Sequence, residues 1–115
     1  MYQEVKSTSV DGRFQIRTDV WEARASLWVE SPAIFSTEAE APLLQFLSEL
    51  WSLDRAEWSS NEIVELTMRK YPGNHKPSQI AVTINCKERS ASLGSSQSVP
   101  LSELEALLEK QLSWF

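Results

Sequence analysis

Hydrophobic and polar residues alternate most regularly between Val20 and Glu30. One face of this segment would carry Trp21, Ala23, Ala25, Leu27 and Val29, and the other Glu22, Arg24, Ser26, Trp28 and Glu30. A period of two over this length predicts one half-buried antiparallel strand. We expect Pro32 to end that strand, because proline cannot donate to a ladder of hydrogen bonds.

Shorter alternating runs predict further strands on both sides of this segment. Asp11-Gly12 is a turn signal, and the residues around it are expected to form a hairpin. A second hairpin is expected over Glu62–Asn85, with the turn-rich segment Pro72–Ser78 at its tip. The expected short strands are Gln3–Val10, Arg13–Arg17, the two arms of the second hairpin around Val64–Met68 and Ile80–Ile84, and a weaker run at Ser90–Leu93.

Two segments have the spacing of amphipathic helices. From Glu38 to about Leu53, apolar residues recur every three or four positions, and Pro42 suits a first helical turn. These residues are Leu43, Leu44, Phe46, Leu47, Leu50 and Trp51. Near the C-terminus, Ser102-Glu103-Leu104-Glu105 has the pattern of a capping box, which predicts a helix that runs to Phe115.

The order of these elements predicts the fold class. Strands come in runs and do not alternate singly with helices, so a parallel sheet is not expected. We predict an α+β fold, with an antiparallel β-sheet of about six strands and two α-helices packed on one face. With 115 residues and no linker or repeat, the chain is expected to form a single domain over residues 1–115.

Negative charge is concentrated in the middle third of the chain. Between Glu30 and Glu65 there are eight carboxylates and one basic residue, Arg55, so this segment sums to −7 while the whole chain sums to −5. Such a distribution favours a basic protein partner and disfavours nucleic acid. Some of the charge has a structural alternative, because Glu38 and Glu40 would lie at the N-terminus of the predicted helix, where the macrodipole favours anions.

Catalytic and metal-binding patterns are weak. His75 is the only histidine and lies in a turn-rich segment, and Cys86 is the only cysteine, in a run that reads as a buried strand. The segment Gly73–Lys76 lacks the spacing of a phosphate-binding loop and would join two strands. Glu38 and Glu40 read as helix-terminal residues and not as a glycosidase pair. We therefore expect no enzyme activity, no metal and no cofactor.

Nothing in the sequence predicts a membrane segment. No stretch approaches about 18 consecutive apolar residues, and residues 1–18 lack the apolar core of a signal peptide. We therefore expect a cytoplasmic protein with no membrane partner.

Five tryptophans are many for a chain of this length, and some are expected to lie on a surface that a partner covers. We predict that the contact surface includes two of them and three nearby acids. The predicted partner-binding residues are Trp28, Glu49, Asp54, Glu57 and Trp58. The alternative for each is structural: Trp51 and Trp58 would fill the core, and the acids would be solvated.

The order of the predicted elements resembles that of the WapI-type immunity family, small bacterial proteins that neutralise polymorphic toxins. The features that carry the resemblance are the alternating strand Val20–Val29, the helical pattern Leu43–Trp51, the Trp58-Ser59-Ser60 lead-in to a strand, the His75 loop, the strand Ile80–Ile84 and the late helix Ser102–Phe115. The resemblance implies a non-catalytic protein that binds the toxic domain of a cognate toxin and blocks it; many such toxins are basic.

A homo-oligomeric structural or regulatory module is the alternative function. It is motivated by the exposed position expected for Trp28 and by the edge of the predicted hairpin Glu62–Asn85, which could pair with a second copy in a homodimer.

Overall fold

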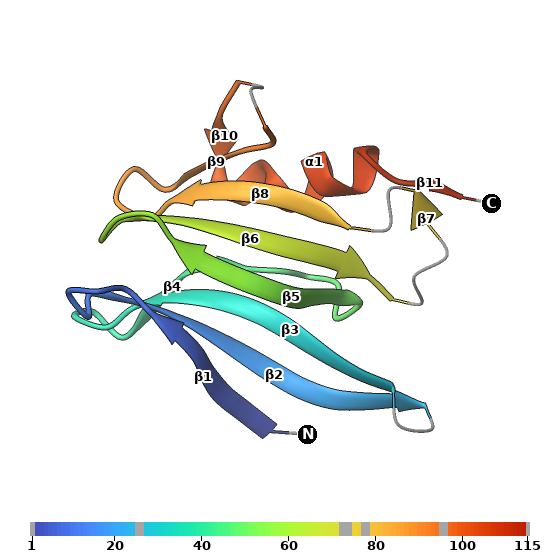
Figure 1. Cartoon of the computed structure of the whole chain (residues 1–115), viewed down its shortest axis with the longest axis horizontal. Coiled ribbons are helices and arrows are strands. Elements are labelled where there is room, and N and C mark those ends of the chain that lie inside the picture. The colour runs from blue at the N-terminus through green and yellow to red at the C-terminus, as the bar shows by residue number, and fades with distance from the viewer. Residues whose placement is uncertain (1, 25–26, 72–74, 77–78, 95–96, 115) are drawn as a thin grey trace.

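The computed structural model of the chain describes residues 2–24, 27–71, 75–76, 79–94 and 97–114. Strands dominate these residues, and the helical elements lie together near the C-terminus (Figure 1). The elements are β1 Tyr2–Thr8, β2 Phe14–Arg24, β3 Leu27–Ser36, β4 Ala41–Gln45, β5 Trp51–Trp58, β6 Ile63–Lys70, β7 His75–Lys76, β8 Ile80–Asn85, β9 Ser90–Ser92, β10 Val99–Pro100, the 3₁₀ turn η1 Leu101–Glu103, α1 Leu104–Lys110 and β11 Ser113–Trp114.

Two antiparallel sheets make up the body of the protein. The first sheet has the order β1-β2-β3-β4, and the second has the order β10-β9-β8-β6-β5. A short ribbon of β11 and β7 accompanies them. The two sheets approach each other where β3 lies beside β5 (Figure 1), and the Ser52 hydroxyl accepts a hydrogen bond from the Glu30 amide at 3.1 Å.

The predicted fold class is therefore wrong. The described residues form nine strands in two sheets and one short helical segment, instead of about six strands under two helices. The hairpins around Asp11-Gly12 and between β6 and β8 are where the sequence predicts them. Most of the predicted loop Pro72–Ser78 lies outside the described residues.

The predicted helix Glu38–Leu53 is two strands, β4 and β5, with a connection between them. Leu44 pairs with Ile34 of β3 and is buried, whereas Leu47 is 97% exposed, so the apolar residues do not share a helical stripe. Pro42 is tolerated because β4 is the edge strand of the first sheet, where a missing N–H can face away from the ladder. Pairing with β3 has overridden helical propensity.

The segment Val20–Glu30 is a hairpin and not one strand. In this hairpin Val20 pairs with Glu30, Trp21 with Val29 and Glu22 with Trp28, so these partners have the same numerical parity, and the register shifts before Arg24 pairs with Leu27. Over the first three pairs, a single alternating strand and a hairpin place the same residues on each face, so the alternation there does not distinguish the two structures. The turn itself, residues 25–26, lies outside the described residues.

Pro32 lies inside β3, opposite Thr18, and does not end the strand. The pairing of β3 with β4 begins only at Ala33. At Pro32 the side of β3 that faces away from β2 is therefore not part of a ladder, and the missing N–H breaks no pairing there.

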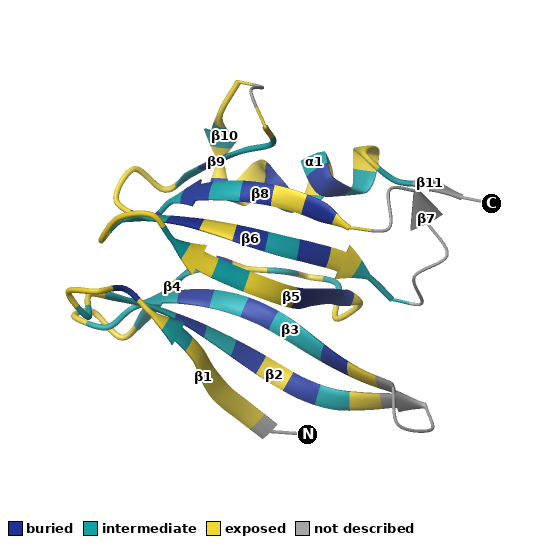
Figure 2. Ribbon diagram, viewed as in Figure 1, coloured by how far each residue is buried: buried dark blue, intermediate teal, exposed yellow. Residues whose placement is uncertain are grey.

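One apolar cluster joins both sheets and the helix. The second sheet contributes alternate residues of β5, β6 and β8, the first sheet contributes residues of β2, β3 and β4, and the C-terminal helical segment closes the cluster. Figure 2 shows the resulting alternation of buried with more exposed residues along β6 and β8. The cluster includes Ile16, Ile34, Leu44, Trp51, Leu53, Val64, Leu66, Met68, Val82, Ile84, Leu101, Leu104 and Leu108.

Trp51 is the largest fully buried side chain in this cluster. Its ring lies 6.3 Å from that of Phe46, and the Lys70 ammonium sits 5.8 Å from its centroid. Lys70 also donates to the Glu109 carboxylate of α1 at 2.6 Å, so the helix and β6 enclose the ring together. The indole N–H has no acceptor among the described residues, which costs about 1–3 kcal/mol and leaves packing to hold the ring.

The C-terminal helix is shorter than predicted and lacks the predicted capping box. No side chain caps the N-terminus of η1 or of α1, and α1 ends at Lys110, while Phe115 lies outside the described residues. The Glu105 carboxylate reaches instead to the β4–β5 connection. It accepts hydrogen bonds from the Leu47 amide at 2.7 Å and from the Ser48 amide at 3.0 Å, and so ties that connection to the helix.

Replacing Glu105 by glutamine should lower the free energy of unfolding by about 1–2 kcal/mol, because two charge-assisted hydrogen bonds to backbone amides are weakened. Ser102→Ala should change it by less than about 0.5 kcal/mol, because Ser102 is exposed and caps nothing in this structure. Urea unfolding of both variants checks this. If both variants lost the same free energy of unfolding, Ser102 and Glu105 would act together as a capping box. That result would contradict the contact of Glu105 with the β4–β5 connection.

Candidate functional site

The five predicted contact residues lie in separate places. Asp54 and Glu57 are exposed on β5, in the face of the second sheet that points away from the core, hereafter the outer face. Glu49 is exposed in the β4–β5 connection, and Trp28 is 48% exposed near the start of β3. The structure therefore brings only the β5 residues together. Glu49 and Trp28 belong to other parts of the surface.

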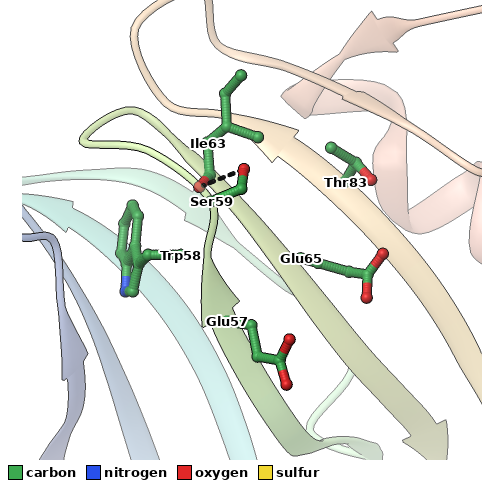
Figure 3. A pocket seen from close by; sticks show the side chains of 6 residues that line it. All are labelled: Glu57, Trp58, Ser59, Ile63, Glu65 and Thr83. Atoms are coloured by element: carbon green, nitrogen blue, oxygen red, sulfur yellow. Dashed lines mark hydrogen bonds between the residues drawn. The ribbon is translucent and has the colours of Figure 1, made fainter.

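Trp58 ends β5 and is only partly exposed. Its indole N–H donates a hydrogen bond to the Ser7 hydroxyl of β1 at 2.8 Å. In Figure 3 the ring points toward the first sheet, away from the Glu57 carboxylate. Trp58 therefore links the two sheets, and it packs against the apolar cluster while staying partly exposed.

The outer face of the second sheet is largely polar, and most of it is not covered by the described residues. Ser52 of β5, the partner of Arg69, is buried where it contacts Glu30 of β3. None of the other outward-pointing residues of β5, β6 and β8 is buried, whereas the opposite face of the same strands lies in the core. These other outward-pointing residues are Asp54, Arg55 and Glu57 of β5, Ile63, Glu65, Thr67 and Arg69 of β6, and Ala81, Thr83 and Asn85 of β8.

Two carboxylates face each other across adjacent strands of this face. Glu57 of β5 is the direct partner of Glu65 of β6, and Glu65 is in turn the partner of Thr83 of β8. Like charges directly opposite each other destabilise an antiparallel pair. An arrangement that opposes folding and occurs on an uncovered face is a candidate for function.

These residues line a shallow depression of about 280 Å³ at one end of the outer face (Figure 3). The carboxylates of Glu57 and Glu65 extend from the same side of the sheet, with Thr83 beyond them and Ile63 at the end near the turn. The complete lining is Glu57, Trp58, Ser59, Ile63, Glu65 and Thr83. Sequence reasoning missed Glu65, Ile63 and Thr83, because only the register of β5, β6 and β8 aligns them with Glu57.

Most of the acids in the acidic segment are paired with bases, which come from other parts of the chain except for Arg55. Five of its eight acids form ion pairs: Glu30 with Lys6, Glu40 with Arg17, Asp54 with Arg69, Glu57 with Arg55, and Glu62 with Arg13 and Lys87. Within the described part of the chain, Glu38, Glu49 and Glu65 have no ion-pair partner. Of these three, only Glu65 lies on the outer face, so the unbalanced charge there is centred on Glu65 and its neighbour Glu57.

Asp54 is more constrained than Glu57 and Glu65. Its carboxylate accepts from the Arg69 guanidinium at 2.9 Å and from the Gln79 side-chain amide at 2.8 Å. The β5–β6 register shifts at this residue. Asp54 therefore ties β5 to β6 and to the start of β8, and its charge is already balanced.

The structure gives no support for Cys86 as a nucleophile. Cys86 follows the last residue of β8 and is buried, whereas His75 belongs to β7, which comes before the start of β8. Burial, with a smaller contribution from Glu62, raises the pKa of the Cys86 thiol to about 12, which keeps it protonated. The thiol is an apolar core group.

The described residues contain neither a metal-binding cluster nor a helix that could cross a membrane. Within the described ranges, no three or more His, Cys, Asp or Glu side chains are grouped to hold a metal ion. No helix in the same ranges has the length and hydrophobicity needed to cross a membrane.

Comparison with known proteins gives no relative: no family model, no curated protein and no solved structure matches this chain. The residues of the outer face are therefore the basis for assigning a role.

Replacing Glu65 by glutamine should raise the free energy of unfolding by about 0.2–1 kcal/mol, because it removes the repulsion from Glu57. Adding salt to about 0.5 M should shrink the gain, since salt screens exposed charges. Urea unfolding at two salt concentrations checks both statements, with Glu88→Gln in the β8–β9 turn as the control. A loss of stability in Glu65→Gln would contradict the repulsion.

The stability of the wild type should fall as the pH rises above the ordinary thiol pKa of 9.0, because the folded state keeps the Cys86 proton up to about pH 12 and the unfolded state does not. Cys86→Ala should lose this part of the pH dependence. Urea unfolding at several pH values between 8 and 11 compares the two proteins. Identical slopes would show that the thiol is not held protonated by burial.

Proposed function

We propose that this protein is a non-catalytic binding protein that recognises a basic protein partner through the outer face of its second sheet. The observation that carries the proposal is the direct pairing of Glu57 with Glu65 on an uncovered face. A cationic side chain placed between the two carboxylates would convert their repulsion into attraction. The cost of this pairing to the free protein would then be recovered on binding.

The chemistry of the depression suits a lysine or arginine side chain. Glu65 has no ion-pair partner among the described residues, and Glu57 shares its charge with Arg55. The Ile63 and Thr83 side chains lie beside the carboxylates and can contact the aliphatic stem of the incoming residue. An arginine would have the advantage that its planar group can donate to both carboxylates at once.

The biological role that we propose is that of an immunity protein, which binds the toxic domain of a cognate toxin in the cytoplasm and blocks it. Three features support it: the net charge of −5, the uncovered acidic pair, and the resemblance of the sequence order to the WapI-type family. The predicted helix Leu43–Trp51 is absent, so the resemblance now depends on the strands and on the late helical segment.

The role of the predicted contact residues changes accordingly. Glu57 remains in the proposed contact, and Glu65 joins it. Asp54 and Trp58 hold the strands that present the two carboxylates, through their bonds to Arg69 and Ser7. Glu49 and Trp28 are not part of this face.

The test is capture of a partner from native lysate with the full chain, washed at low and then at high salt, with wild type and Glu57→Lys/Glu65→Lys in parallel. We expect the wild type to retain a basic protein that the double variant loses, and high salt to release it. Glu88→Lys/Glu103→Lys is the control, because it changes the net charge equally at exposed positions away from the outer face.

A captured protein must then be expressed alone and together with this chain. The proposal requires that it inhibits growth when alone, and that wild type abolishes the inhibition while Glu57→Lys/Glu65→Lys does not. If both double variants bound the partner equally well, the contact would not lie on the outer face. A harmless partner would contradict the immunity role and leave the binding face in place.

A further inference from the structure

A second depression lies on the first sheet, where the chain leaves β4. Residues Ala33–Ser36 of β3 pair with β4, and after Gln45 the β4–β5 connection departs from β3. The space between them is about 280 Å³ and is bordered by β2, β3 and the connection. This volume is at the lower limit of pockets for small molecules, so one long side chain fits it better than a larger ligand does.

Two carboxylates without a balancing base border this depression. Asp19 of β2 and Glu49 of the connection are both exposed, and neither carboxylate has an ion-pair or hydrogen-bond partner among the described residues. Arg17, two residues before Asp19, is engaged elsewhere. Its guanidinium lies 4.2 Å from the centroid of the Phe35 ring and pairs with Glu40 at 3.0 Å. A cationic group from outside the chain can therefore balance the two acids.

Apolar groups lie beside the two carboxylates. They belong to Pro32 and Ala33 of β3 and to Phe46 and Leu47 of the connection. Acidic groups next to apolar surface suit a lysine or arginine side chain, whose aliphatic stem contacts the apolar groups while its charged end meets the acids. The chemistry of the lining thus selects a long cationic side chain.

The connection that borders the depression is fixed at both sides. The amides of Leu47 and Ser48 donate to the Glu105 carboxylate of α1 at 2.7 and 3.0 Å. The Ser31 hydroxyl of β3 donates to the Glu49 carbonyl at 2.8 Å. A surface that is already ordered before binding loses less conformational entropy when a partner docks on it.

Leu47 decides between a free cation and a protein segment. It is 97% exposed at the border of the depression, although its backbone is held by Glu105. A small cation that fills the depression would leave this leucine in water. A protein segment can place an apolar residue on it as well, and covering apolar surface is favourable.

We propose that this depression binds a lysine or arginine side chain of an extended protein segment, and that an apolar residue of the same segment covers Leu47. Side chains two residues apart lie on the same face of an extended segment, so the apolar residue is expected two positions from the basic one. The site goes beyond the proposed binding function, because the first sheet and the β4–β5 connection form it, whereas Glu57 and Glu65 belong to the second sheet.

A short peptide tests the site directly. The probe is acetyl-Leu-Ser-Arg-Ser-Leu-amide, which places a leucine two positions from the arginine in either chain direction. It is titrated into the isotope-labelled full chain and followed by NMR. The backbone amide signals of Ser31, Ala33 and Ser48 should shift and saturate together, because these residues line the depression.

Two altered peptides separate charge from apolar contact. Citrulline in place of arginine keeps the shape and removes the charge, and should weaken binding by about tenfold. Alanine in place of both leucines should weaken it by about threefold or more, because Leu47 is no longer covered. Equal affinity of the alanine peptide would contradict the protein segment and assign the depression to a free organic cation.

Charge variants of the protein locate the contact. Asp19→Asn/Glu49→Gln should weaken binding of the arginine peptide by about tenfold, because both carboxylates are neutralised. Glu88→Gln/Glu103→Gln changes the net charge equally at exposed positions outside the depression, and should leave the affinity unchanged.

A second pair of variants tests the apolar contact. Leu47→Ala keeps the backbone amide that donates to Glu105, and should weaken binding by about threefold. Val10→Ala is the control, because Val10 is also an apolar residue with 86% exposure but lies in the β1–β2 turn. Circular dichroism confirms that all variants fold.

Three results would overturn the site: no shift of the three amide signals at millimolar peptide, equal binding of the citrulline peptide, or equal affinity of the two charge variants. Shifts confined to the amides of Glu57 and Glu65 would also overturn it, and would leave the proposed binding function in place. Binding at the depression in a protein that captures no basic partner would have the opposite meaning. The two proposals therefore fail separately.

Discussion

The structure depends on covering one apolar face of the second sheet. Val64, Leu66 and Met68 of β6 and Val82 and Ile84 of β8 are all at most 1% exposed, and they need a layer against them. The helix α1 is too short to cover them alone, so the first sheet supplies the rest of the cluster through residues of β2, β3 and β4. Trp51 is fully buried in this cluster, at the start of β5, where the two sheets approach each other.

Because the covering elements all lie on one side, the other side of the second sheet remains open. The register of β5, β6 and β8 then decides what this open side presents, and it places Glu57 directly beside Glu65. The same packing distributes the rest of the acidic segment among basic residues of β1, β2 and the turns. The strongly negative stretch of sequence therefore gives a surface on which most negative charges are balanced by ion pairs. On the outer face, the unbalanced negative charge is confined to one small site, at Glu57 and Glu65.

Local patterns predicted those strands whose neighbours are close in the sequence. The alternation of Val64 to Met68 and of Ile80 to Ile84 was sufficient, because each of these strands buries one face and the two form a single hairpin. Leu43 to Trp51 has helical spacing, but the sequence does not reveal that β3 has a free edge for Leu44 to pair with, or that Trp51 begins another sheet. Glu105 has the spacing of a cap, yet its partners are 57 and 58 residues away.

The candidate site could be predicted only in part for the same reason. The acidic segment indicates Glu57, but its partner Glu65 is eight residues further on, across a turn, and is aligned only by the β5–β6 register. The sequence predicts Trp58 as a surface aromatic residue, whereas in the structure Ser7 of β1 accepts a hydrogen bond from its indole N–H. Charge counted along a chain therefore indicated the kind of partner, and only the pairing of strands located the contact.

The most direct test of the central claim, that the acidic pair of the outer face contacts a basic partner, is zero-length carbodiimide cross-linking of the complex followed by mass spectrometry. This chemistry joins a carboxylate to a lysine in contact with it. The account predicts cross-links from Glu57 or Glu65 to lysines of the partner. Cross-links confined to Glu38, Glu49 or Glu88, with none at the acidic pair, would contradict it.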